Sequence, residues 1–351
     1  MKTEKLSVVE QFGENGYEEY RIPSIIITEK GTVLTAYEAR QEKGNDWSRV
    51  DIAVRRSCDQ GRSFEAPVFL PVETEEAMNG KQTWSNPVLI ADGEVIHLLF
   101  CQNYEKVWYC TSLDEGRSFG LPRDLTGVFK SFSYRWNVCA VGPGHGIVSE
   151  KGRLIVPVWL ANGEVRTDLD PSGRIKNHFP SAAGCVYSDD HGKTWETGFV
   201  TQGIENANET TAAEMENGKI LFNFRNERYE KCRVMGIADE TLTYLEKVWT
   251  EEALPDPTCF GSMARGKNGL YFVNCANSDQ KRLYSERIHL TLYRSCDQAA
   301  SWDAVGEVDY YGGYADICIY EGYAYIFYEH CREGKVEQLV LSRIRAEEEK
   351  G

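Results

Sequence analysis

The sequence predicts an all-β fold, a six-bladed β-propeller whose blades are four-stranded antiparallel sheets. The first observation is that six times along the chain an apolar, β-rich run meets a short polar turn with a glycine and continues into a second β-rich run. Such units are hairpins, in which glycine supplies the positive φ that a tight turn requires. Their turn glycines are Gly31, Gly93, Gly152, Gly218, Gly269 and Gly322.

The spacing of these hairpins predicts propeller blades. A strand-only repeat of about 58 residues has the length of one four-stranded blade. Six such repeats use nearly all of the 351 residues, so we predict one propeller domain over residues 1–351. The runs at 5–13 and 338–346 both look like strands. We expect them to share the last blade, which closes the ring and removes its free edges.

A second repeat lies between the hairpins and reads Ser-x-Asp-x-Gly-x-x-aromatic, starting at Ser57, Ser112, Ser188 and Ser295. It predicts a turn between the two outer strands of a blade, in which the carboxylate accepts backbone N–H groups and the aromatic ring packs between sheets. Because the same role recurs in different blades, we interpret these aspartates as structural rather than metal-binding or catalytic. The fourth copy has Ala299 where glycine is expected, so its turn should be strained or altered. The four aspartates are Asp59, Asp114, Asp190 and Asp297.

Charge and composition exclude several classes of protein. With 39 basic and 54 acidic residues, the net charge of −15 disfavours binding to nucleic acid or an anionic membrane. An anionic small substrate then needs a local cluster of arginines. No apolar run is long enough to span a membrane, and the opening segment has no apolar core of a secretory signal, so a cytoplasmic protein is expected.

The eleven cysteines show no metal-finger spacing and are expected to be reduced. No phosphate-binding loop, dinucleotide fingerprint or histidine ligand spacing is present, so we predict neither a metal nor another cofactor.

Strand direction predicts where polar residues meet. The hairpin turns should all lie at one rim of the propeller. Residues just before the first strand of a blade, just after its second strand or just before its third strand then lie at the opposite rim, around one mouth. Four arginines, two carboxylates and a tyrosine occupy such positions, and their convergence indicates an anionic ligand. Asp51 lies inside a strand and is expected to be structural. The seven are Arg21, Arg40, Asp46, Glu209, Arg225, Arg287 and Tyr314.

Several of these residues lie in motifs that resemble those of one known family. The motifs are YRIP at 20–23, NDWSRVDIAVRRS at 45–57, GPGHGI at 142–147, NETTAAEMENGKILFNFRN at 208–226, RIHLTLYRSCD at 287–297 and GGYADI at 312–317. Together with the Ser-x-Asp repeats, the Asp boxes of that family, they make the chain similar to the six-bladed exo-α-sialidases (neuraminidases). The resemblance covers about residues 20 to 325.

The resemblance implies a role for each of the seven residues. Arg21, Arg225 and Arg287 would clamp the carboxylate of sialic acid, since planar guanidinium groups bind carboxylates in a bidentate way. Tyr314 would be the nucleophile with Glu209 as its base. Asp46 would be the acid/base, with Arg40 beside it. The implied activity is that of a retaining exo-glycosidase that releases terminal α-linked sialic acid from a sialylated glycan or oligosaccharide through a tyrosyl-enzyme intermediate.

Two alternatives stay open. The chain is also compatible with a hydrolase or transferase acting on another 2-keto-3-deoxy sugar acid, Kdn or Kdo, or with a non-catalytic sialic-acid-binding propeller. The second alternative predicts loss of Asp46, Glu209 or Tyr314, and all three are present. Linkage preference and oligomeric state are not predicted. Further candidates for the same mouth are Trp47, Trp84, Asn86, Phe132, Trp136 and His145.

Overall fold

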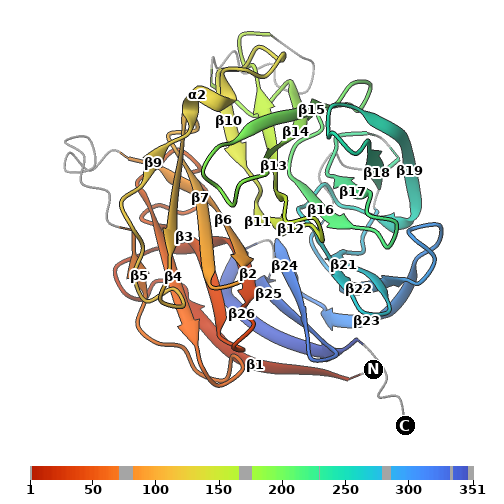
Figure 1. Cartoon of the computed structure of the whole chain (residues 1–351). Helices are drawn as coiled ribbons and strands as arrows, with labels where there is room; N and C mark the ends of the chain where they lie inside the picture. Colours follow the sequence, from red (N-terminus) through yellow and green to blue (C-terminus); the bar gives the residue numbers. More distant parts are fainter. Residues whose placement is uncertain are drawn as a thin grey trace.

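The computed structural model describes residues 2–70, 82–165, 176–228, 230–278, 286–332 and 335–346. Its strands form six sheets arranged around a central axis, as Figure 1 shows. Within each sheet, consecutive strands pair in the antiparallel direction. The predicted six-bladed propeller is therefore confirmed.

The first three sheets are formed by consecutive stretches of the chain. The first contains β2 (Glu19–Ile27), β3 (Val33–Arg40), β4 (Val50–Ser57) and β5 (Val68–Phe69). The second contains β6 (Trp84–Asp92), β7 (Val95–Gln102), β8 (Lys106–Ser112) and β9 (Arg123–Asp124), followed by the short helix α2 (Thr126–Phe129). The third contains β10 (Val138–Val141), β13 (Leu154–Ala161), β14 (Ser181–Ser188) and β15 (Glu196–Val200).

The last three sheets repeat the plan. The fourth contains β16 (Thr210–Glu214), β17 (Ile220–Phe224), β18 (Cys232–Ala238) and β19 (Leu245–Pro255). The fifth contains β20 (Ser262–Gly266), β21 (Gly269–Cys275), β22 (Leu290–Ser295) and β23 (Asp303–Asp309). The sixth contains β24 (Ala315–Tyr320), β25 (Tyr323–Arg332), β26 (Lys335–Arg345) and β1 (Thr3–Gln11).

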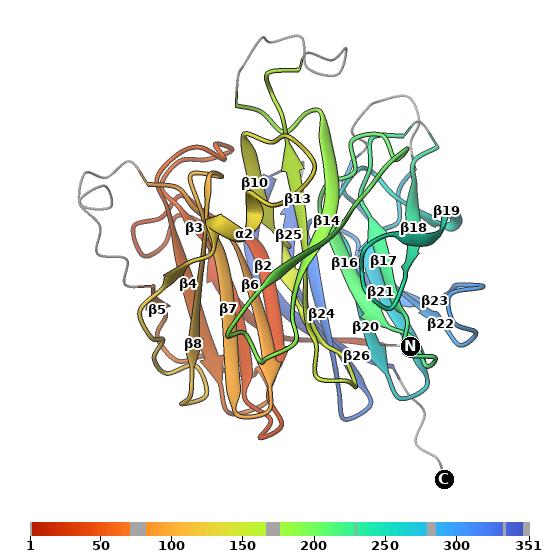
Figure 2. The ribbon, with the colours of Figure 1, turned by 45° about the horizontal axis from the view of Figure 1, so that its top comes forward.

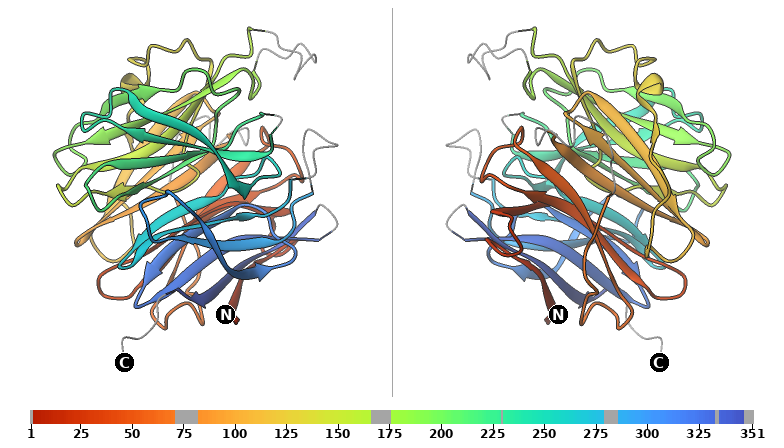
Figure 3. Two further views of the ribbon diagram at one scale, coloured as in Figure 1. Left: turned by 90° about the vertical axis from the view of Figure 1, so that its right-hand side faces the viewer. Right: turned by 90° about the vertical axis from the view of Figure 1, so that its left-hand side faces the viewer.

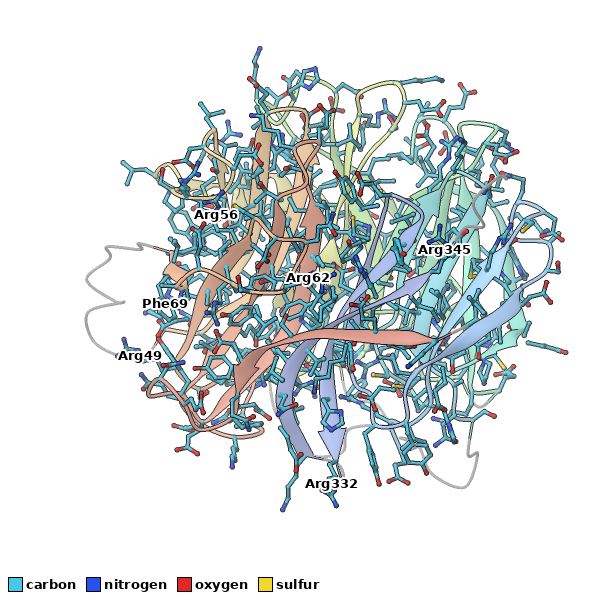
Figure 4. All side chains as sticks on the ribbon, turned by 90° about the horizontal axis from the view of Figure 1, so that it is seen from below. Arg49, Arg56, Arg62, Phe69, Arg332 and Arg345 are labelled. Carbon is cyan, nitrogen blue, oxygen red and sulfur yellow. The ribbon has the colours of Figure 1, made fainter. Side chains whose placement is uncertain are left out.

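The first and last strands close the ring as predicted. β1 pairs with β26 from Thr3 opposite Ile344 to Gln11 opposite Gln338. Figure 4 shows β1 lying against the blue strands of this blade. The blade is thus completed by both ends of the chain, which leaves fewer unpaired strand edges.

The third blade keeps the hairpin predicted around Gly152 but has a divided inner strand. In place of one continuous inner strand, β10 and β12 (Ile147–Val148) pair with opposite ends of β13, while β11 (Gly144–His145) crosses to pair in parallel with β6. Glycine permits this crossing, because a Cβ on Gly142 would lie 2.6 Å from Val88 and one on Gly144 would lie 2.8 Å from Phe260. Both glycines also have positive φ.

The four Asp boxes are turns between third and fourth strands, as predicted. In the first box, Asp59 accepts hydrogen bonds from the Ser63 N–H at 2.9 Å and the Ser63 hydroxyl at 2.6 Å. The fourth box keeps the same geometry. Ala299 adopts a φ of 66° and donates its N–H to the Ser295 hydroxyl at 2.9 Å. The expected strain is therefore local, since alanine takes a left-handed conformation that glycine favours.

The core lies between neighbouring blades. One cluster, for example, joins Leu34 and Ile26 of the first sheet to Leu89 and Leu98 of the second. All eleven cysteines are free thiols, and most are buried. No group of side chains suited to a metal ion is found in the described ranges, and no helix there has the length and apolarity to cross a bilayer.

The strands run between two rims, which places the strand ends at defined levels. Figures 2 and 3 show the blades from the side, with the tight turns of the hairpins at one rim and longer connections at the other. The seven candidate residues lie at the rim opposite the hairpin turns, at the ends of β2, β3, β16, β17, β22 and β24 and in the β3–β4 connection.

Candidate active site

One cavity of about 500 Å³ is lined by all seven predicted residues. They come from four of the six blades, and positions as distant in the sequence as Arg21 and Tyr314 lie side by side in it. The arrangement predicted from strand direction is therefore present. It gathers four guanidinium groups in a protein whose overall net charge is −15.

A tyrosine and a glutamate form a hydrogen-bonded pair on the floor of the cavity. The Tyr314 hydroxyl donates to Glu209 Oε1 at 2.7 Å and accepts from Arg225 Nη1 at 2.6 Å. Arg225 also forms an ion pair with Glu209. Burial raises the pKa of Tyr314 well above 10, and Glu209 raises it further, while Arg225 and Arg287 act in the opposite direction. The resting phenol is protonated and already directed at a base.

Three arginines surround the ring of this tyrosine. The Cζ atoms of Arg21, Arg225 and Arg287 lie 5.2, 5.9 and 5.0 Å from the centre of the Tyr314 ring. Arg287 has no carboxylate partner in the part of the chain that the structure describes. The cluster thus keeps positive charge available for an anion beside the phenol.

Arg21 projects into the cavity because β2 is irregular at this point. The register between β2 and β3 shifts between Arg21 and Ser24, and Ile22 has a φ of 61° before Pro23. Positive φ is unusual for a β-branched residue, and proline cannot donate to a sheet. The Ile22 N–H is instead donated to Glu329 Oε1 at 3.1 Å.

A buried glutamate contacts both the Arg21 segment and the Tyr314 segment. Glu329 is fully buried, and its Oε1 accepts the Arg21 Nε–H at 2.6 Å. Its Oε2 accepts the Tyr314 backbone N–H at 3.2 Å. One carboxylate on β25 therefore fixes two segments that are almost 300 positions apart in the sequence.

The second charged group of the cavity is centred on Arg40. Its Nη1 donates to Asp46 Oδ1 at 2.7 Å, and its Nε donates to Glu38 Oε2 at 2.8 Å. Glu38 also accepts the Asn86 N–H at 2.9 Å. Burial by itself raises the pKa of Asp46, but the charges of Arg40, His178 and Arg21 outweigh it and lower the pKa to about 2. The Asp46 side chain is 40% exposed and accessible from the cavity.

Aromatic side chains form another wall. The ring of His178 lies 6.0 Å from Trp47, 5.9 Å from Tyr104 and 5.3 Å from Trp159. Burial lowers the pKa of His178, although Asp46 and Glu209 oppose this. Near neutral pH the wall is therefore largely uncharged, which suits the apolar parts of a polar ligand.

The further candidates are only partly placed at this mouth. Trp47 and Asn86 line the cavity. Trp84, Phe132 and Trp136 pack in the core, so the expectation that they approach the mouth was wrong. His145 was also misplaced, because its Nδ1 contacts the buried Asp316 at 2.8 Å below the site.

Asp51 is structural, as predicted, since it accepts a hydrogen bond from the Tyr17 hydroxyl at 2.9 Å and does not line the cavity. Sequence reasoning missed Glu38, Glu329 and Glu227, which are buried carboxylates at the upper ends of second strands or just beyond them. The available signal was a lone acidic residue inside an apolar strand, as in YIFYEHC around Glu329.

The fold and site define a β-propeller with an arginine-lined mouth beside a tyrosine–glutamate pair. A family model described as a BNR repeat-like domain matches residues 31–310. The chain therefore belongs to the BNR repeat-like family, and proteins that it is similar to are named exo-alpha-sialidase and sialidase.

Two relatives give the scale of the similarity. The exo-α-sialidase of Arthroderma benhamiae is 25% identical over 304 residues, covering 78% of this chain and 67% of the relative. The sialidase of Bacteroides fragilis is 24% identical over 322 residues, covering 84% of this chain and 56% of the relative. The chain spans only about half to two thirds of the length of these relatives.

Solved structures share the fold. A Hadza microbial sialidase aligns with a TM-score of 0.78 at 22% identity, covering 96% of this chain and 68% of that chain. A Trypanosoma rangeli sialidase, solved in complex with 2,3-difluoro-KDN, aligns with a TM-score of 0.73 at 20% identity, covering 98% of this chain and 57% of that chain.

Proposed function

We propose that this protein is a retaining exo-α-sialidase that releases terminal α-linked sialic acid through a tyrosyl-enzyme intermediate. The observation that carries the proposal is the Tyr314 hydroxyl, which is hydrogen-bonded to Glu209 and surrounded by three guanidinium groups. Asp46 lines the same cavity. A nucleophile with its base, an anion clamp and a separate acid are the groups that such a reaction requires.

The clamp binds the substrate carboxylate. Arg21, Arg225 and Arg287 supply several N–H donors within the cavity, and hydrogen bonds between charged groups are stronger than those between neutral ones. Because the carboxylate is attached to the anomeric carbon, this contact places that carbon next to the Tyr314 oxygen. A neutral phenol approaches such a centre with less repulsion than a carboxylate does.

In the first step, the Tyr314 oxygen bonds to the anomeric carbon and passes its proton to Glu209, while the bond to the glycosidic oxygen breaks. Asp46 gives a proton to that oxygen, which leaves as an alcohol. In the free protein Asp46 is ionised, since its pKa is about 2. We infer that the bound substrate carboxylate neutralises the clamp and excludes water, and that both effects raise the pKa of Asp46.

In the second step, the Asp46 carboxylate takes a proton from water, and the water oxygen bonds to the anomeric carbon. The bond to Tyr314 breaks, and Glu209 returns the proton to the phenolate. Each step inverts the anomeric centre, so the product has the configuration of the substrate. In support, a Trypanosoma rangeli sialidase has been solved with 2,3-difluorosialic acid as a covalent intermediate.

The test combines turnover with trapping. The purified protein should release 4-methylumbelliferone from its sialoside, and Tyr314→Phe should lower kcat by about a thousandfold or more, because the nucleophile is lost. Incubation with 2,3-difluorosialic acid should release fluoride from C2 and add one 3-fluorosialyl group to the wild-type peptide that contains Tyr314. Turnover by the wild type without this adduct, or an inverted product seen by NMR, would refute the mechanism.

The same clamp also suits the carboxylate of Kdn or Kdo, so the substrate requires its own comparison. The complex of the Trypanosoma rangeli enzyme with 2,3-difluoro-KDN makes Kdn the first alternative. Sialoside and Kdn glycosides with the same leaving group should be compared by kcat/KM. A preference for the Kdn glycoside would change the substrate and leave the mechanism in place.

A further inference from the structure

One carboxylate on the wall of the candidate active site has no role in the proposed reaction. Glu227 lines the same cavity as Arg225 and Glu209, and only 4% of the residue is exposed. Neither of its two carboxylate oxygens has a hydrogen-bond partner among the residues that the structure describes. A buried carboxylate without hydrogen bonds destabilises a protein. An arrangement of this kind, open to a cavity, indicates that a ligand supplies the missing hydrogen-bond donors.

The backbone places Glu227 one step above Arg225. β17 ends at Phe224, but backbone pairing continues beyond it, since the Arg225 N–H is donated to the Glu209 carbonyl oxygen at 3.1 Å. The Glu227 N–H is likewise donated to the Glu205 carbonyl oxygen at 3.1 Å. In an extended segment, residues two positions apart share a face and are separated by about 7 Å. The Glu227 carboxylate therefore lies nearer to the rim than the clamp, within reach of substituents that extend from a clamped sugar ring.

The cations around Glu227 have other partners. Burial raises the pKa of Glu227, and the charges of Arg225 and Lys231 only partly offset this effect. Arg225 Nη1 donates to the Tyr314 hydroxyl at 2.6 Å, and Lys231 Nζ donates to the Thr258 hydroxyl at 3.0 Å. The Arg225 Nε–H is also buried, and no described residue accepts it. Unmet acceptors and an unmet donor on neighbouring side chains suit hydroxyl groups, because a hydroxyl both donates and accepts.

We propose that Glu227 is a specificity-determining residue that accepts hydrogen bonds from two adjacent hydroxyl groups of the bound sugar acid. The inference rests on the proposed function and deepens it. In sialic acid C3 has no hydroxyl group and C5 has an amide, so adjacent free hydroxyl groups occur only on the side chain at C6. Asp46 belongs to the first blade and Glu227 to the fourth, and these blades lie on opposite sides of the axis (Figure 1). Glu227 therefore contacts the retained sugar and not the leaving group.

The experiment compares two ligands that differ only in this side chain. One is the 2,3-unsaturated sialic acid analogue, and the other is the same compound after periodate cleavage and reduction, which leaves a single hydroxymethyl group at C6. Dissociation constants for both are measured by isothermal titration calorimetry with the wild type, Glu227→Gln and Glu227→Ala. Glu214→Gln is the matched control, because Glu214 is a buried glutamate of the same blade that does not line the cavity. Turnover of the 4-methylumbelliferyl sialoside tests the proposed function separately.

The wild type should bind the shortened analogue more weakly than the complete one. In both Glu227 variants the ratio of these two dissociation constants should fall by about tenfold or more, as expected for a lost hydrogen bond to a charged group. The ratio cancels any effect of the removed charge on the clamp, because both ligands have the same carboxylate. Glu214→Gln should leave the ratio within about twofold of the wild type.

An unchanged ratio in the Glu227 variants would overturn the assignment, since Glu227 would then act only on Arg225 or on water. A wild type that binds the complete analogue but does not cleave the sialoside would overturn the proposed function, while the ratio would still decide the role of Glu227 in binding. Failure of the wild type to bind either analogue would overturn both.

Discussion

Replacing Glu329 by glutamine tests whether one buried carboxylate holds the site together. The side chain is fully buried and accepts hydrogen bonds from Arg21 Nε at 2.6 Å, Ile22 N at 3.1 Å and Tyr314 N at 3.2 Å. Glutamine has one carbonyl oxygen and one NH₂ group. Whichever way the amide turns, an NH₂ group faces an N–H donor, and Arg21 loses its negative partner.

The size of the effect follows from this geometry. Removing one partner of a buried ion pair costs about 3–5 kcal/mol. An unfolding entropy of about 2.1 cal/mol/K per residue over 351 residues gives about 0.7 kcal/mol per degree. The melting temperature of Glu329→Gln should therefore fall by about 4–7 °C.

The assay is differential scanning calorimetry at pH 7, with Glu164→Gln as the matched control. Glu164 forms a 2.7 Å ion pair with Arg135, but the two side chains are 48% and 81% exposed. An exposed pair contributes about 0–1 kcal/mol, so the control should shift by less than about 1.5 °C. Affinity for the 2,3-unsaturated sialic acid analogue should fall only in Glu329→Gln. Equal shifts for the two variants would refute the reasoning.

Three further predictions concern single groups. Asp46→Asn should lower kcat/KM for sialyllactose by about a hundredfold or more. It should lower kcat/KM for 4-nitrophenyl sialoside much less, because nitrophenolate leaves without a proton. Similar losses on the two substrates would contradict the role of Asp46 as the acid. Burial raises the pKa of Glu227 above its usual 4.5, so the folded state binds more protons and loses stability as pH rises beyond this value. Glu227→Gln should therefore gain melting temperature relative to the wild type as the pH rises above 4.5, and a pH-independent difference would exclude this. Gly192→Ala should lower the free energy of unfolding in urea by about 1–3 kcal/mol more than Gly218→Ala does. Both glycines have positive φ, but a Cβ on Gly192 would lie 2.2 Å from the Tyr109 hydroxyl, whereas a Cβ on Gly218 would meet open space. Equal losses of unfolding free energy would argue against the contact with Tyr109.

The repeats in the sequence were sufficient to predict the six-bladed architecture. Hairpin glycines at near-regular spacing predicted six blades, and the Asp boxes fixed where third and fourth strands join. The pairing of the two chain ends followed from the need to close the ring. The divided inner strand of the third blade was not predicted, because it depends on close approaches of Gly142 and Gly144 to side chains of other blades.

The direction of the strands also predicted some of the residues that line the candidate active site. Residues at strand ends, such as Arg225 and Tyr314, were predicted to share one mouth because strand direction alone sets their level. Trp84 and Phe132 were wrongly expected there, because level along a strand does not decide whether a side chain turns to the axis or to the neighbouring blade.

The sequence by itself determined the number of blades, the rim that carries the polar residues and the chemical types gathered at that rim. These properties depend on local turn chemistry and on alternation along single strands, which act over a few residues. Only the tertiary structure decided that Glu329 joins Arg21 to Tyr314 and that no described residue donates a hydrogen bond to the buried Glu227 carboxylate. The physical reason is that those features arise from contacts between blades, where the packing of each side chain is set by residues far away in the sequence.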